Sequence, residues 1–386
     1  SCCVGYLIDR YDFDVICLSA FIGEASNKDV LRRRAYSAGA KKVYIEDLKK
    51  EFADDFILPA LQAHASYEDL YLLATAIGRP LIAKHLVAIA QKEKADYVAH
   101  GCTGKGNDQV RIEIGVRSLD PSLKIIAPLR EWEFTSREEE VDYAKKHNIK
   151  VDVTKKSIYS IDRNIWGAAI EAGILEDPWV EPREDAYYLT RGTVPKKPRY
   201  VTVRFKEGVP VAVDGKRMGI VRLIERLNDT AGKYKIGRTD VIENRLVGIK
   251  SREIYEAPAA TLLMAAHREL ENLVYDRDFI HFKKSLSLKY GELAYNGLWF
   301  SSTREALDSF FSTHQQHVSG TVRFKLSERT FAVVGRRSQQ SMYDEKLATY
   351  SAEDQFNHES ARGFIELWGL PNVVRAMRDT RMKKRK

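Results

Sequence analysis

Helices alternate with short apolar strands through the first 150 residues, and this alternation constrains the fold more than any other feature of the sequence. Because a strand followed by a helix returns most readily to a parallel neighbour, the alternation predicts a mostly parallel sheet with helices on both faces. In such sheets ligands bind at the carboxyl ends of the strands. The pattern predicts helices over 1–11, 29–38, 48–64, 81–94 and 136–147, and strands over 14–21, 41–45, 97–99 and 124–127.

The second half of the chain has a different pattern. Prolines interrupt a polar stretch at 178–198, which we interpret as the crossing between two domains. Beyond it, the sequence predicts an α+β domain with antiparallel strands over 200–206 and 209–213, two helices over 259–296 that break near Tyr275, and a hairpin over 321–334. After Pro371 a last helix is expected to leave this domain as an arm.

A glycine-rich loop follows the strand predicted over 97–99. Gly101, Gly104 and Gly106 lie within six positions, and Lys105 stands between the second and third. Glycines let a backbone approach a phosphate closely, and the N–H groups at a helix start bind anions. The loop is not the common G-x-x-x-x-G-K-[ST] motif, because Gly106 stands where Ser or Thr is needed. By pattern alone it is either a phosphate-binding loop or an ordinary corner between a strand and a helix.

Composition excludes several classes of protein. No apolar run reaches the length of a membrane-spanning helix, so we expect no membrane partner. The net charge of +8 comes from 62 basic residues scattered among 54 acidic ones, apart from a basic tail at 378–386, and this predicts no nucleic-acid partner. The four cysteines lack metal-ligand spacing, which predicts a cytoplasmic protein with neither disulfides nor a bound metal site.

The loop and the helix after it carry a motif that resembles a known family. Residues 100–111 read H-G-C-T-G-K-G-N-D-Q-V-R, which closely resembles the H-G-x-T-G-K-G-N-D-Q-x-R signature of argininosuccinate synthases. The resemblance continues in order along the chain, through G-A-K-K-V at 39–43, Y-E-D-L-Y at 67–71, Y-S-I-D-R-N at 159–164, G-I-L-E-D-P-W at 173–179, G-R-T-D-V-I-E-N-R at 237–245 and K-S-R-E-I-Y-E at 250–256.

The resemblance implies a fold and an activity. The fold would be an α/β, doubly wound and mostly parallel sheet of the adenine nucleotide alpha hydrolase-like, ATP-pyrophosphatase type, with a second α+β synthetase/multimerisation domain and a C-terminal helical arm. Its parts would be a nucleotide-binding domain at 1–157, the synthetase/multimerisation domain at 158–368 and an oligomerisation helix at 369–386 of a homotetramer. The activity would be ligation of citrulline and aspartate, in arginine biosynthesis, with ATP split to AMP and pyrophosphate. Mg²⁺ would accompany the ATP.

The resemblance also assigns residues to each substrate, and it identifies no general acid or base. The ATP-binding residues would be Ser1, Ala20, Gly101, Thr103, Gly104, Lys105, Gly106 and Asn107. Aspartate would be held by Thr103, Asn107 and Asp108. Citrulline would be held by Tyr71, Ala76, Asn107, Arg111, Ser160, Ala169, Glu243 and Tyr255. Taken singly, each of these residues has a commoner structural role, and only the joint match favours the functional one. The helical histidines His85, His267 and His314 are expected to be structural.

The sequence departs from the family in ways that bear on activity. Ala76 and Ala169 stand where relatives have serines that contact citrulline, and Glu253 and Ala260 stand where glycine is usual. Ser1 would be the last residue of the family's S-G-G-L-D-T-S pyrophosphate loop; the sequence lacks the rest of that loop and the strand before it, which predicts little activity for the chain as written. Two alternatives stay open: a catalytically impaired relative that keeps the fold and the oligomer, or another ATP-pyrophosphatase-type ligase, such as a tRNA-thiolating or an amidotransferase-type enzyme.

Overall fold

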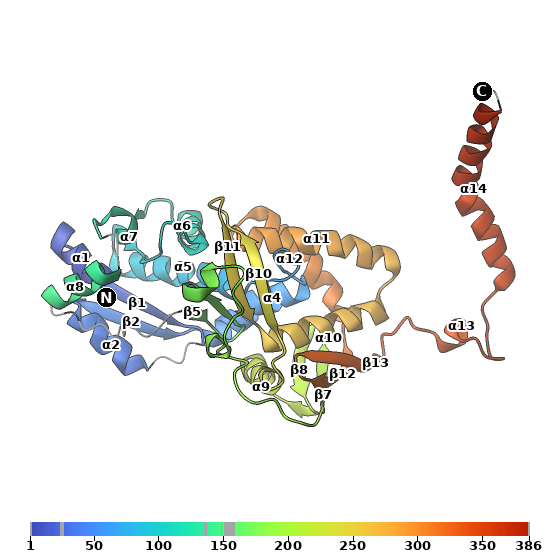
Figure 1. Cartoon of the computed structure of the whole chain (residues 1–386), viewed down its shortest axis with the longest axis horizontal. Coiled ribbons are helices and arrows are strands. Elements are labelled where there is room, and N and C mark those ends of the chain that lie inside the picture. Colours follow the sequence, from blue (N-terminus) through green and yellow to red (C-terminus); the bar gives the residue numbers. More distant parts are fainter. Residues whose placement is uncertain (1, 24–26, 135–136, 148, 150–158, 385–386) are drawn as a thin grey trace. The chain divides into compact units, whose positions relative to one another are not determined.

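Parallel strand pairs and helices form the first part of the chain, as the alternating pattern predicts (Figure 1). The structure is a computed structural model, and it describes residues 2–23, 27–134, 137–147, 149 and 159–384. The helices of this part are α1 (Cys2–Tyr11), α2 (Lys28–Ser37), α3 (Lys49–Glu51), a π-helical turn (Phe52–Ile57), α4 (Leu58–Gln62), α5 (Ala74–Glu93), α6 (Asn107–Leu119), α7 (Pro128–Glu131) and α8 (Arg137–Lys146). The strands are β1 (Ile16–Phe21), β2 (Lys42–Asp47), β3 (Tyr97–Ala99) and β4 (Lys124–Ile126).

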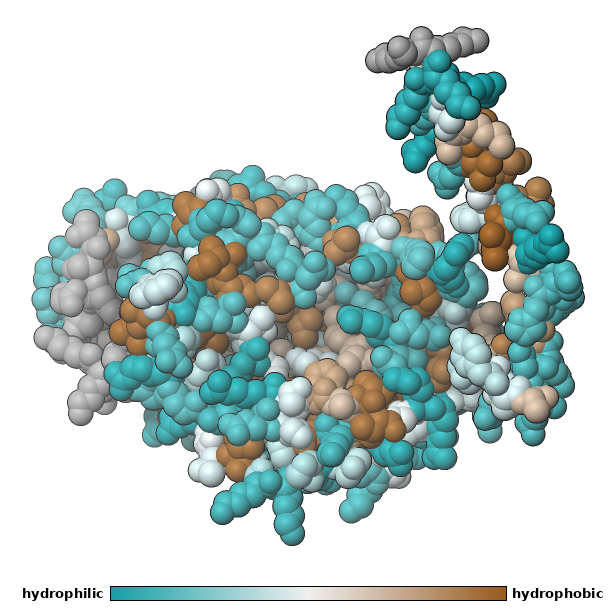
Figure 2. Space-filling model, turned by 45° about the vertical axis from the view of Figure 1, so that its right-hand side comes forward, coloured by the Kyte–Doolittle hydropathy of each residue, from teal (hydrophilic) through white to brown (hydrophobic). Residues whose placement is uncertain are grey.

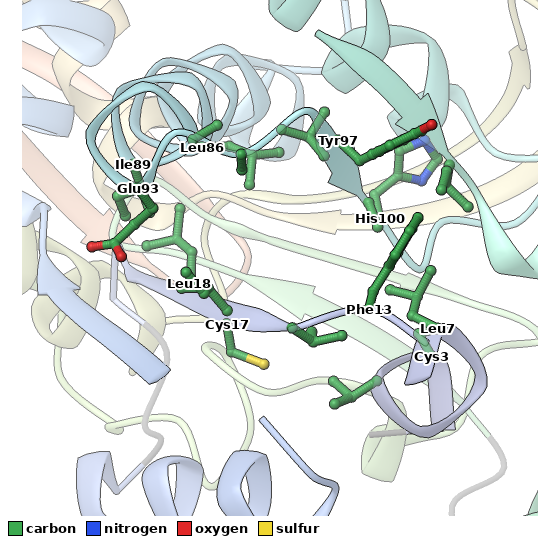
Figure 3. Close-up of a pocket in the computed structure, with 18 of the residues that line it drawn as sticks. Cys3, Leu7, Phe13, Cys17, Leu18, Leu86, Ile89, Glu93, Tyr97 and His100 are labelled. Carbon is green, nitrogen blue, oxygen red and sulfur yellow. The ribbon is translucent and has the colours of Figure 1, made fainter. Parts of the chain in front are cut away.

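The four strands of this part form two separate parallel pairs, β1 with β2 and β3 with β4. The sequence predicted one continuous sheet, so the parallel pairing is confirmed, whereas the continuity is not seen among the described residues. A cavity of about 480 Å³ is lined by both β1 and β3 (Figure 3). Its other walls are apolar residues of α1 and α5, among them Leu7, Leu86 and Ile89. Such a lining is typical of core packing rather than of a site for charged substrates.

Two antiparallel sheets follow. The first has the strand order β10-β11-β6-β5 and the second β13-β12-β7-β8-β9. Their strands are β5 (Ser160–Arg163), β6 (Ala168–Glu171), β7 (Arg199–Lys206), β8 (Val209–Val213), β9 (Lys216–Arg217), β10 (Arg238–Asn244), β11 (Lys250–Glu256), β12 (Gly320–Ser327) and β13 (Thr330–Arg337). The predicted hairpin over 321–334 is therefore confirmed as β12 and β13.

Four longer helices accompany these sheets: α9 (Ile220–Gly232), α10 (Pro258–Val274), α11 (Arg277–Tyr295) and α12 (Ser302–His314). The predicted break near Tyr275 is confirmed, because α10 ends at Val274 and the side chain of Asp276 caps the first turn of α11. Single-turn 3₁₀ segments complete this part at Gly173–Glu176, Glu184–Ala186 and Gln315–His317.

One large hydrophobic core joins the π-helical turn, α4 and α5 to α9–α12 and the second antiparallel sheet. Trp166, Tyr290 and Tyr295 are its largest fully buried side chains. Because segments far apart in the sequence share this core, residues 1–340 form one compact unit.

Residues 341–386 form a second unit, which contains α13 (Glu345–Ala348) and α14 (His358–Lys383). The last helix begins earlier than Pro371 and continues through that proline. Its apolar side chains are exposed, and Figure 2 shows them as brown patches along the helix. No helix among the described residues is long and apolar enough to cross a membrane.

Candidate active site

The glycine-rich loop joins the end of β3 directly to the start of α6. The N–H of Gly106 donates to the carbonyl of Thr103 at 3.2 Å, and the side-chain amide of Gln109 donates to the carbonyl of Gly104 at 2.5 Å. Gly101, Thr103, Gly104 and Lys105 are exposed. Hydrogen bonds within the loop and from α6 therefore hold its backbone, while its surface at the N-terminus of α6 is exposed and can bind an anion. Ala20 is the penultimate residue of β1, and Ser1 lies outside the described residues.

Four of the residues predicted to hold citrulline lie on one face of the sheet β10-β11-β6-β5. Tyr255 is opposite Ala169, which is in turn opposite Asp162. Residues two apart on a strand share a face, so Ser160 belongs with Asp162. By the same rule Glu243, which pairs with Ser251, belongs with Tyr255. The sheet thus gathers residues that are far apart in the sequence onto one surface.

Tyr71, three residues before α5, meets this face. Its ring stacks on that of Tyr255, with centroids 3.9 Å apart. Its hydroxyl oxygen accepts the backbone N–H groups of Thr75 and Ala76 at 3.0 and 3.1 Å, and so caps the first turn of the helix. Burial raises the pKa of Tyr71 to about 12, so the phenol stays neutral. Ala76 is fully buried beneath it.

Asp108 lies between two guanidinium groups. Its carboxylate accepts hydrogen bonds from Arg79 at 2.7 Å and from Arg111 at 3.1 Å. Burial by itself would raise the pKa of Asp108, but the two arginines outweigh it and hold that pKa below its ordinary value. Arg79 also pairs with Asp162 on the sheet face. The carboxylate of Asp108 therefore orients two arginines, in addition to any ligand that it binds.

Two guanidinium nitrogens in this cluster have no partner among the described residues. They are Nε of Arg79 and Nη2 of Arg111, and both are buried. A buried charged donor without an acceptor costs about 1–3 kcal/mol or more, and a carboxylate is its natural complement. Both nitrogens therefore indicate a site for an anionic group of a ligand.

Glu243 is buried and held by two phenols. The hydroxyl of Tyr295 donates to its Oε1 at 2.6 Å, and that of Tyr255 donates to its Oε2. Tyr295 also accepts the amide of Asn107 at 2.7 Å. Asn107 and Glu243, predicted separately from two distant motifs, are thereby connected through one side chain.

A second carboxylate cluster lies beside this site. Arg245 pairs with both Glu171 and Glu253, and it donates to the backbone carbonyl of Lys105 at 3.3 Å. Burial, together with the charge of Glu171, raises the pKa of Glu253 to about 8 although Arg245 opposes that rise. Arg245 thus connects the turn between β10 and β11 to the glycine-rich loop.

The structure also identifies residues that sequence reasoning missed. Arg79 carries a detectable signal, since it is a charged residue inside an otherwise apolar stretch of helix and such residues are rarely buried without partners. Tyr295 carries none, because nothing in the sequence distinguishes it from the core tyrosine Tyr290.

His64 and the buried His267 belong to one hydrogen-bonded network. His64 contacts His267 at 2.7 Å, and His267 contacts Gln315 at 2.8 Å. Potential metal ligands of His64, His267 and Glu271 lie within 4.8 Å of one another. However, Lys283 donates to Glu271 at 2.5 Å and already supplies the positive charge that a metal would bring. We therefore interpret this cluster as structural.

Comparisons with known proteins match both halves of the chain. The family model described as the arginosuccinate synthase N-terminal HUP domain matches residues 1–150, and the model of the arginosuccinate synthase C-terminal domain matches residues 159–375. The argininosuccinate synthase of Dictyoglomus thermophilum is 53% identical over 378 residues, which cover 98% of this chain and 95% of the relative. That of Symbiobacterium thermophilum is 52% identical over 380 residues, covering 97% and 94%. That of Oceanobacillus iheyensis is 52% identical over 376 residues, covering 97% and 90%.

Proposed function

The chain belongs to the argininosuccinate synthase family, and we propose that it ligates citrulline to aspartate while it splits ATP to AMP and pyrophosphate. The observation that carries this proposal is that Glu243 and Tyr255 share one sheet face and that Tyr295 connects Glu243 to Arg111, whose buried Nη2 has no partner among the described residues. A guanidinium and a carboxylate held at one site match the two charged ends of a free amino acid.

In this proposal the first step activates citrulline. The ureido oxygen of citrulline attacks the α-phosphorus of ATP, the bond to the β-phosphate breaks, and pyrophosphate leaves with a citrullyl-adenylate remaining. Arg111 receives the carboxylate of citrulline and Glu243 its ammonium group, while Tyr71 and Tyr255 form the wall beside the side chain. Catalysis is then mainly the positioning of the two reacting atoms.

The second step joins aspartate. Its amine attacks the ureido carbon, and the bond from that carbon to the ureido oxygen breaks as AMP leaves. We propose that aspartate is held by Thr103, Asn107 and Asp108. The unpaired Nε of Arg79 supports one addition, a contact with a carboxylate of this substrate. Asp108 would then act both on the ammonium group and through the arginines that it orients.

The loop at 101–107 is proposed to hold the ATP phosphates, with Ala20 beside the nucleotide. Mg²⁺ fits this proposal as an ion that arrives with ATP, since it keeps several waters and needs only one or two protein carboxylates. Asp108, the acidic residue at the loop, is already paired with two arginines, so the described residues form no preassembled carboxylate site for the ion.

Further predictions rest on the sequence and the family. We propose that the two parallel strand pairs belong to one doubly wound sheet of the HUP type. The division at 157/158 and 368/369, the homotetramer and the cytoplasmic location remain proposals.

The test is to incubate the protein with ATP, Mg²⁺, citrulline and aspartate and to measure AMP, pyrophosphate and argininosuccinate. Equal amounts of all three, and none when citrulline is left out, support the proposal. AMP release that depends on another acceptor would favour a different ATP-pyrophosphatase-type ligase. Nucleotide binding without product would favour the impaired relative.

A further inference from the structure

Tyr295, the last residue of α11, lies at the centre of the proposed site although no motif points to it. Its side chain is fully buried. The hydroxyl oxygen accepts a hydrogen bond from Nδ2 of Asn107 at 2.7 Å and donates one to Oε1 of Glu243 at 2.6 Å. We propose that Tyr295 is a positioning residue that fixes Asn107 and Glu243 relative to each other, and so sets the geometry in which citrulline meets the nucleotide loop. This inference rests on the proposed function.

The direction of these hydrogen bonds follows from counting protons. A phenol carries one proton, and the amide nitrogen of Asn107 can only donate. The proton of Tyr295 therefore goes to an acceptor, and the carboxylate of Glu243 lies closer than the carbonyl of Asn244, at 2.6 against 3.2 Å. Burial and the charge of Glu243 raise the pKa of Tyr295, so this proton is retained. The two hydrogen bonds therefore run in one direction, from the amide of Asn107 to the phenol of Tyr295 and from that phenol to the carboxylate of Glu243.

Asn107 is fixed at both ends of its amide. Its Oδ1 accepts the backbone N–H of Leu246 at 2.9 Å, in the turn between β10 and β11. Its Nδ2 is bound by Tyr295. Since Asn107 is the first residue of α6, both contacts attach the glycine-rich loop to elements of the second half of the chain.

Tyr295 also contacts a third residue of the site. Its backbone carbonyl accepts Nε of Arg111 at 2.9 Å, and the guanidinium group lies 4.8 Å from the centre of its ring. These contacts hold Arg111 while Nη2 stays unpaired. The ring itself is held by Tyr67, which stacks on it with centroids 3.4 Å apart. Because Tyr295 is itself held in place, it can fix the positions of Asn107, Glu243 and Arg111 relative to one another.

The alternative is that Tyr295 is only a core tyrosine, and the same helix provides the control for that reading. Tyr290 is also fully buried, and its hydroxyl donates to Asp308 at 2.8 Å, outside the proposed site. Tyr295→Phe and Tyr290→Phe each remove one buried hydroxyl that is bonded to a carboxylate. Tyr295→Phe also leaves Nδ2 of Asn107 without its acceptor, so it carries the larger structural cost, and only this variant disturbs the proposed site.

The experiment measures steady-state kinetics and thermal unfolding of the full chain and of both variants. We expect a loss of Tm in both variants, larger in Tyr295→Phe, but a loss of about tenfold in kcat/KM for citrulline, mostly through KM, only in Tyr295→Phe. In a Glu243→Ala background, which removes the acceptor, Tyr295→Phe should cost less than about threefold, because the phenol then has no carboxylate to position.

Each outcome decides between the claims. Equal citrulline kinetics in the two phenylalanine variants, or fully additive losses with Glu243→Ala, would overturn the positioning role while leaving the proposed function in place. A parent chain that forms no argininosuccinate would overturn the proposed function, and this inference with it.

Discussion

Asp108 is the residue at which the structure changes the expected chemistry most. The family resemblance assigns it to the ammonium group of aspartate, and its carboxylate also binds Arg79 and Arg111. Removing one partner of a buried charge pair costs about 3–5 kcal/mol, because it leaves the other charge uncompensated. A substitution here should therefore affect both stability and binding.

We expect Asp108→Asn to lower the free energy of unfolding by about 3 kcal/mol and to raise KM for aspartate. Urea denaturation and steady-state kinetics measure the two effects. Citrulline-dependent exchange of pyrophosphate into ATP should survive better than overall ligation, because aspartate enters only in the second step. Equal losses in both assays would contradict the assignment of Asp108 to aspartate.

Ala169 provides a gain-of-function prediction. It lies opposite Tyr255 on the sheet face, so a hydroxyl there would stand beside the proposed citrulline site. A hydrogen bond to a charged group contributes about 1.5–3 kcal/mol. Ala169→Ser, alone and with Ala76→Ser, should therefore tighten citrulline binding by tenfold or more, as measured by calorimetry. Unchanged affinity in the double variant would show that those hydroxyls are not used in this chain.

At the scale of elements, the spacing of apolar residues and the positions of glycine and proline predicted most of the helices and strands. The break between α10 and α11 and the hairpin of β12 and β13 follow from local residues such as Asp276 and were predictable. The start of α5 at Ala74 was not, because Gly78 and Pro80 make the first turns of that helix resemble a loop.

The site was only partly predictable for a related reason. A motif identifies residues that lie close together in sequence, such as Asn107 and Arg111. The contact of Tyr295 with Asn107 spans 188 positions and that of Arg79 with Asp162 spans 83. Neither contact leaves a local pattern, so only the folded chain reveals them.

Glu253, within β11, carries a pH-dependent prediction. The pKa of Glu253 is about 8, above its ordinary value near 4.5, so between these values the folded chain holds a proton that the unfolded chain has lost. The contribution of Glu253 to the free energy of unfolding is therefore fully present below about pH 4.5. It decreases as pH rises toward 8, by up to about 1.4 kcal/mol per pH unit. Glu253→Gln should lose this dependence.

Urea denaturation at pH 5.5, 7 and 8.5 measures this effect. The control is Asp240→Asn, which removes a carboxylate that pairs with Arg252 on the same two strands. The decrease in stability with pH should persist in the control and disappear in Glu253→Gln. The same pH slope in all three proteins would contradict the account of Glu253.

At the scale of the whole molecule, α14 carries an apolar surface that its own unit leaves exposed. The exposed apolar side chains of this helix are Phe364, Ile365, Leu367, Trp368, Leu370, Val373, Val374, Met377 and Met382. An exposed apolar surface of this size indicates a protein–protein contact. A second copy of the chain fits the homotetramer proposed from the family.

We therefore expect the protein to assemble as a tetramer in light scattering. Phe364→Glu combined with Trp368→Glu should reduce the fraction of tetramer, because both exposed rings would be lost from the apolar surface of α14. Arg375→Glu, an exposed substitution outside the apolar set, is the control. A monomeric parent protein, or a tetramer that is unaffected by the double substitution, would contradict this prediction.

The most direct test of the whole account follows an oxygen atom. Citrulline labelled with ¹⁸O in its ureido group is incubated with the protein, ATP, Mg²⁺ and aspartate, long enough for slow turnover to be seen, and the products are analysed by mass spectrometry. If the ureido oxygen attacks the α-phosphorus and aspartate then displaces AMP, the label must leave in the phosphate of AMP, one atom for each argininosuccinate formed. Argininosuccinate formed with unlabelled AMP, or AMP released without argininosuccinate, would contradict the account.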